Sequence, residues 1–194
     1  SQAVAVAAAV NAVADRLLPD NLARTPSRIL NSGGIVTGIS NPSDLVATRG
    51  TSLASGYLVE PGTWEQTRTG RPDGAYALFR SDDAIVEIVT DTLASRTAWY
   101  VLTDRMFIAS TSQRAIVALL GSFEFNPAVV PWMLATGTLG TGLSWDKRIR
   151  HVAGATTITL DRKAWTVVEH TEPTVFSAEP VSDDELGRRV RATL

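Results

Sequence analysis

Residues 73–116 read DGAYALFRSDDAIVEIVTDTLASRTAWYVLTDRMFIASTSQRAI, and this stretch decides the fold. It contains four short runs rich in β-branched and aromatic residues, which tight turns separate, so it predicts antiparallel strands. The predicted strands cover residues 75–80, 84–90, 98–103 and 106–110. Residues 112–120 then place apolar side chains at helical spacing before Gly121, which predicts a helix.

The flanking sequence extends this pattern to the rest of the chain. Residues 2–18 form one predicted helix, and Thr25-Pro26 opens a second that closes at Gly33-Gly34. Strands are expected at 35–39, 56–60, 148–153, 155–160 and 165–170, with a further helix at 127–134. A linker at 173–180 leads to a capped helix from Ser182. This order predicts an α+β fold of layered antiparallel sheets with flanking helices.

Composition bounds the function. The chain has 194 residues, of which 44% are hydrophobic, enough for one domain with a substantial core. A net charge of −2 argues against nucleic-acid and membrane surfaces, which would need a clustered basic excess. The absence of cysteine excludes disulfides, thiolate metal sites and a cysteine nucleophile, and it is compatible with the cytoplasmic location that we predict.

Three segments in the central stretch resemble motifs of one family. Asparagine synthetases carry patterns such as G-x-F-A-hydrophobic, R-D-x-x-G-x-K-P-L-Y-Y and F-A-S-E-x-K-A-L. The corresponding segments here are Gly74-Ala75-Tyr76-Ala77-Leu78, Asp91-Thr92-Leu93-Ala94-Ser95-Arg96-Thr97-Ala98-Trp99-Tyr100, and Phe107-Ile108-Ala109-Ser110. Downstream, Ile149-Arg150-His151-Val152-Ala153-Gly154-Ala155 is similar to an I-x-x-L-x-P-G turn, with alanine in place of proline. The chain thus resembles the N-terminal, class II glutamine-amidotransferase-like domain of that family.

The resemblance implies an Ntn-hydrolase-like sandwich over residues 1–180. Residues 181–194 would begin the connection to a C-terminal synthetase domain that uses ATP and magnesium. The family's amidotransferase domain needs an N-terminal cysteine and motifs that hold glutamine, and neither is found here. The expected function is therefore a non-catalytic domain that braces an ATP-dependent, amide-forming ligase. The synthetase domain is the expected partner, with a homodimer as an alternative assembly, and no cofactor is expected in this chain.

Ser1 is the single candidate nucleophile, because serine also serves in N-terminal nucleophile hydrolases. Such a nucleophile normally begins a strand, whereas Ser1 leads into an alanine-rich helix pattern. An N-terminal-serine amidohydrolase and a free-standing interaction module remain the alternatives.

Other constellations favour structural roles. His151 and His170 lie far apart in a chain without cysteine, so no metal site is expected. Asp82-Asp83 fits a solvated turn better than a catalytic carboxylate pair. The loop Gly137-Thr138-Leu139-Gly140-Thr141-Gly142 lacks the ending of a phosphate-binding loop. Lys147, Arg148 and Arg150, beside Trp145, predict a surface patch or an interdomain contact.

Overall fold

The computed structural model describes residues 2–23, 25–59, 62–173 and 181–193. Within these residues the first half of the chain forms α1 (Gln2–Leu17), β1 (Arg28–Ser32), β2 (Ile35–Ile39), β3 (Val46–Arg49), β4 (Ser52–Leu58), β5 (Gly74–Ser81) and β6 (Ile85–Thr90). The second half forms β7 (Trp99–Leu102), β8 (Phe107–Ser110), α2 (Gln113–Leu120), α3 (Val129–Thr136), β9 (Arg150–His151), β10 (Thr156–Asp161), β11 (Thr166–Thr171) and α4 (Asp183–Thr193). The fold is α+β, with antiparallel sheets in layers, as the sequence predicts.

Two sheets face each other across the main core. The larger sheet has six strands in the order β11-β10-β6-β5-β4-β3, and the smaller has the order β8-β7-β9. Every neighbouring pair in both sheets is antiparallel. Alternation along β5, β6 and β10 points Ala77, Ile88 and Ile158 at Tyr100 of β7 and at Ala98 just before it, and these five residues are buried in one cluster. Hydrophobic burial between the sheets therefore holds the sandwich together.

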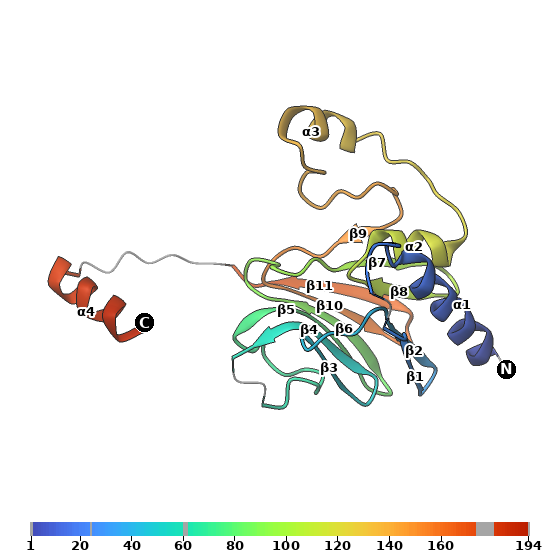
Figure 1. Cartoon of the computed structure of the whole chain (residues 1–194), viewed down its shortest axis with the longest axis horizontal. Helices are drawn as coiled ribbons and strands as arrows, with labels where there is room; N and C mark the ends of the chain where they lie inside the picture. Colours follow the sequence, from blue (N-terminus) through green and yellow to red (C-terminus); the bar gives the residue numbers. More distant parts are fainter. Residues whose placement is uncertain (1, 24, 60–61, 174–180, 194) are drawn as a thin grey trace.

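The outer face of each sheet has its own cover. The other face of β5 and β6 packs Tyr76, Leu78 and Val89 against Trp64, which lies in the segment between β4 and β5. The other face of β7 packs Trp99 and further apolar side chains against helix α2. The molecule is therefore layered as covering segment, larger sheet, smaller sheet and helix (Figure 1).

Helix α1 packs beside this sandwich, against the β1–β2 hairpin and α2 (Figure 1). Val13 and Ala14 are its buried apolar residues. By contrast, α3 projects away from the sheets, and α4 stands apart from the rest of the molecule (Figure 1). None of the helices in the described part of the chain has the length and hydrophobicity that a membrane span requires.

One sequence prediction is wrong. Residues 28–32 form strand β1 where a short helix was expected after Thr25-Pro26. Gly33 and Gly34, interpreted as the helix end, have φ of +57° and +77° and form the two-residue turn that pairs β1 with β2. Two positive φ angles are what a type I′ hairpin requires, so the glycine pair serves a hairpin. Strand β3, which the sequence analysis did not predict, adds the outer edge of the larger sheet.

The remaining predicted elements are confirmed within a few residues. The four strands of the central stretch and the β10–β11 hairpin form in the expected order. Helix α2 begins after Ser112 and ends at Gly121, which adopts the left-handed conformation with φ +68°. At α4, Ser182 Oγ accepts a hydrogen bond from the backbone N–H of Glu185 at 3.3 Å, as the capping pattern indicates. The predicted linker at 173–180 falls largely outside the described residues.

Candidate functional site

A cleft of about 640 Å³ opens between the two sheets, next to edge strand β11. We call it the inter-sheet cleft. Tyr100 and Arg150, which lie opposite each other on β7 and β9, form one wall. Val167 and Glu169 of β11 form the facing wall, and Trp165 of the β10–β11 turn lies at its end. The volume lies within the roughly 300–1,000 Å³ that is typical of small-molecule sites.

Strand alternation explains why these residues meet. Val167 packs against the core between the sheets, and Glu169, two residues on, points to the same side of β11. Glu169 lies opposite Ile158, a core residue of β10. Because cross-strand partners share a face, Arg150 projects on the same side as its partner Tyr100. Side chains from both sheets therefore converge on one space.

Trp165 joins the two sheets at this cleft. Its indole Nε1 donates a hydrogen bond to the carbonyl oxygen of Thr103, in the β7–β8 turn, at 2.8 Å. Its φ is +55°, a left-handed conformation that is costly for a bulky side chain. The hydrogen bond between the β10–β11 turn and the β7–β8 turn holds the indole half-buried against the cleft despite this strain.

Electrostatics centre on the Tyr100 hydroxyl. Burial raises the pKa of Tyr100 above its ordinary value, and the charge of Glu169 adds to the rise. The neighbouring Arg150 guanidinium lowers the pKa and offsets part of that increase. At neutral pH the phenol is protonated, so its hydroxyl offers both a donor and an acceptor between two opposite charges.

The other cations at the cleft are neutralised by their own partners. Arg148 binds the fully buried carboxylate of Asp146 at 2.6 Å and also pairs with Glu124 at 3.3 Å. Lys147 pairs with Glu124 at 3.1 Å. The guanidinium of Arg148 lowers the pKa of Asp146 to about 2, with help from backbone N–H donors. This network fixes the loop that leads into β9.

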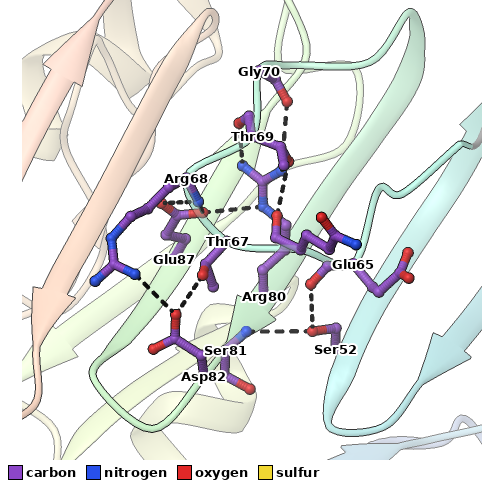
Figure 2. Close-up of polar contacts among 11 residues, drawn as sticks. Ser52, Glu65, Thr67, Arg68, Thr69, Gly70, Arg80, Ser81, Asp82 and Glu87 are labelled. Atoms are coloured by element: carbon purple, nitrogen blue, oxygen red, sulfur yellow. Dashed lines mark hydrogen bonds and ion pairs between the residues drawn. The ribbon is translucent and has the colours of Figure 1, made fainter.

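A second polar cluster lies on the outer face of the larger sheet (Figure 2). Arg80 and Glu87 face each other across β5 and β6, are only 1% and 4% exposed, and pair at 3.1 Å. Arg80 also donates to the hydroxyl of Thr69 at 2.7 Å and to its carbonyl at 3.2 Å. The Glu87 carboxylate accepts the backbone N–H of Arg68 at 3.1 Å. The pair thus fastens residues 67–70 onto the sheet and leaves Glu87 no role as a free base.

Asp91 organises a third cluster from segments that are remote in sequence. Its carboxylate accepts backbone N–H groups of Tyr76 at 2.9 Å, Leu93 at 2.8 Å and Ser95 at 3.0 Å. Its carbonyl accepts the N–H of Ala155 at 2.8 Å. Asp91 thus satisfies the donors of the turn that follows it and ties that turn to β5 and to the start of β10.

Most of the other residues that the sequence singled out serve the fold. His151 is half-buried against Trp99, with ring centroids 4.4 Å apart, and burial lowers its pKa. His170 lies on the other sheet, exposed on β11. In the part of the chain that the structure describes, no group of three or more histidine or acidic residues could hold a metal. Ser1 lies outside the described residues, and the residue after it already belongs to α1.

The Asp82-Asp83 pair forms a turn. The Asp82 carboxylate accepts N–H groups of Ala84 and Ile85 at 2.7 Å each. A hydrogen bond from the hydroxyl of Thr67, followed by these backbone donors, lowers the pKa of Asp82, the opposite of what a shared-proton pair needs.

The glycine-rich loop at 137–142 follows the end of a helix. Gly137 terminates α3 with φ +71°. A phosphate would therefore meet the negative end of the α3 dipole, whereas phosphate-binding loops precede a helix. Gly140 approaches the Trp132 ring so closely that a Cβ there would collide with it. The loop thus packs against its own helix.

The predicted basic cluster is divided by the structure. Lys147, Arg148 and Arg150 lie at the inter-sheet cleft, whereas Trp145 lines a different cleft between α1 and α2. Trp145 also stacks with Phe125, with ring centroids 6.5 Å apart, and Phe125 contacts Phe123 at 6.4 Å. We call these three exposed rings the aromatic patch.

No known family model matches the chain, and no curated protein is detectably similar to it.

Neither the buried pair of Arg80 and Glu87 nor the contribution of Trp165 and Glu169 to the cleft was predicted from the sequence. Arg80 lies in phase with Tyr76 and Leu78 along β5, so the two-residue period could have indicated its burial. The cleft gave no such signal, because its two walls come from different sheets.

Proposed function

We propose that this chain is a degenerate, Ntn-hydrolase-like domain related to the glutamine-amidotransferase domain of asparagine synthetases. It would brace the synthetase domain of an ATP-dependent, amide-forming ligase and would not hydrolyse glutamine. ATP and magnesium would act on the synthetase domain, and the described residues of this chain would supply contact surface.

The cluster around Asp91 carries this proposal. Of the four segments that resemble the family's motifs, three meet there, at residues 74–78, 91–100 and 149–155. Tyr76 and Ala155 donate to the carboxylate and the carbonyl of Asp91. Gly154 lies so close to the backbone of Thr92 that no side chain would fit. Motifs that share one packed cluster support common ancestry of the fold better than separate matches would.

The bracing role draws support from the aromatic patch. Phe123 is 53% exposed, Phe125 49% and Trp145 41%, and Phe125 contacts each of the other two rings. Clustered exposed aromatic side chains are typical of protein interfaces. The patch also borders the α1–α2 cleft, which Phe123 and Trp145 help to line. A partner domain seated here would bury the rings.

The test uses the natural polypeptide, whose intact mass and reading frame are determined first. A downstream domain with a Ser-Gly-Gly-x-Asp-Ser-type pyrophosphatase loop and ATP–pyrophosphate exchange is expected. Phe125→Ser should lower the exchange rate or the thermal stability of the whole protein. The control Leu93→Ser, which replaces another exposed apolar residue away from the patch, should leave both unchanged. A reading frame that stops at Leu194 would remove the ligase proposal.

Glutamine hydrolysis separates the proposal from its main alternative. An N-terminal-serine amidohydrolase would release ammonia from glutamine, and Ser1→Ala would abolish that release. The bracing domain predicts no ammonia release above the uncatalysed rate with either chain. If the frame stops at Leu194 and no hydrolysis occurs, the free-standing interaction module becomes the working description.

A further inference from the structure

Two opposite charges at the inter-sheet cleft have no ion-pair partner among the residues that the structure describes. Lys147 and Arg148 are held by Glu124 and Asp146, so their charges are balanced. Among the residues that the structure describes, Arg150 and Glu169 form no ion pair, either with each other or with a third group. A charge-bearing ligand can therefore bind both without displacing an existing ion pair.

The two charges flank one hydroxyl from opposite walls. Arg150 of β9 is the cross-strand partner of Tyr100 and lines the same wall, and Glu169 of β11 lines the facing wall. A guanidinium is suited to bind a carboxylate through parallel hydrogen bonds, and a carboxylate is suited to bind an ammonium group. A molecule with its own carboxylate and ammonium on neighbouring atoms would complement both walls, and Tyr100 could bond to either group.

Apart from Thr166 and the two paired cations Lys147 and Arg148, the remaining lining of the cleft is apolar or aromatic. Leu102 and Val167 extend the two walls, and the half-buried Trp165 indole is fixed at the end by its hydrogen bond to Thr103. These surfaces favour a ligand with an apolar side chain, because burying apolar area against them is favourable. An amide or a charged group buried against the same surfaces would lack a hydrogen-bond partner.

We propose that the inter-sheet cleft binds a free α-amino acid with an apolar side chain. Arg150 would hold the carboxylate, Glu169 the ammonium group, and Trp165 with Leu102 and Val167 the side chain. This inference does not depend on the bracing function, because it rests only on the lining of the cleft.

The first test is a ligand series measured by calorimetry on the unmodified chain. L-leucine and L-phenylalanine should bind, whereas their N-acetyl derivatives and their methyl esters should each bind about tenfold more weakly or worse. Glutamine should bind more weakly than leucine. Inorganic phosphate tests the alternative of a simple anion site. Absence of amino-acid binding, or phosphate binding that competes with it, would overturn the proposal.

Variants then assign the two charges. Arg150→Gln and Glu169→Gln should each weaken L-leucine binding about tenfold or more, while Arg96→Gln, an exposed arginine away from the cleft, should not. Circular dichroism confirms that each variant is folded, and because Glu169 is exposed on an edge strand, its variant should retain the wild-type melting temperature. The N-acetyl derivative should bind wild type and Glu169→Gln equally, since it lacks the ammonium group. Unchanged leucine binding by Glu169→Gln would refute the assignment.

Discussion

Replacing Arg80 by methionine tests how the covering segment is held on the larger sheet. The substitution removes the guanidinium while keeping most of the apolar stem. It leaves the carboxylate of Glu87, 4% exposed, with only the backbone N–H of Arg68 as a partner. The hydroxyl and the carbonyl of Thr69 also lose their donors.

The structure sets the size of the expected loss. Breaking a buried ion pair by removing one partner costs about 3–5 kcal/mol, because the remaining charge is uncompensated. We therefore expect Arg80→Met to lower the free energy of unfolding by about 4 kcal/mol, a large share of the roughly 5–15 kcal/mol of a typical domain. The double variant Arg80→Met/Glu87→Met removes both charges. It should cost only about 1–2 kcal/mol, for the N–H of Arg68 and the carbonyl of Thr69 that lose partners.

Urea denaturation followed by tryptophan fluorescence measures these values, with the two single variants and the double variant forming a cycle. The matched control is Arg49→Met, which removes the exposed arginine of a partly exposed pair with Glu65 and should cost about 1 kcal/mol or less. The reasoning fails if Arg80→Met costs no more than Arg49→Met. It also fails if the losses of the two single variants simply add in the double variant.

Three further predictions concern single positions. The pKa of Asp146 falls from 3.8 to about 2 on folding, so its ion pair stabilises the protein above pH 4. That contribution, about 2 kcal/mol, should fade between pH 4 and 2 in urea titrations and be absent from Asp146→Asn. Gly74→Ala would drive a Cβ into the carbonyl of strand β4 at φ +151°, and it should lower the melting temperature by about 5 °C or more, whereas Gly70→Ala, in open space, should not. Gly38→Ala would collide with Val10 of α1, and Val10→Ala in the same chain should restore much of the lost stability.

Local signals decided which parts of this fold could be predicted. Strands β5 to β8 and helix α2 follow from short apolar runs, tight turns and the helix end at Gly121, all of which act between near neighbours. The Gly33-Gly34 pair is ambiguous, because glycine ends a helix and forms a hairpin turn for the same conformational reason. Only the pairing partner, β2, resolves it.

The candidate site depends on tertiary structure in a way that no local pattern reveals. Tyr100 and Glu169 are separated by 69 positions and belong to different sheets, so spacing along the chain carries no information about their meeting. The sequence indicated the basic residues near β9. It did not indicate that ion pairs with Glu124 and Asp146 neutralise two of them, because these pairs form only in the folded structure. The sequence shows which residues carry charge, but it does not show which of those charges lack an ion-pair partner in the fold.

The strands β9 and β10 are neighbours in sequence but complete different sheets, since β9 pairs with β7 and β10 pairs with β6. During synthesis, β7 and β6 therefore cannot pair with β9 and β10 until residues 150–161 have been made. Until then β6 and β7 each present unpaired backbone groups, the kind of edge that recruits strands from other chains. Such late, long-range pairing also slows folding. A nascent chain that stalls shortly before residue 150 should consequently aggregate, whereas the completed sandwich should not.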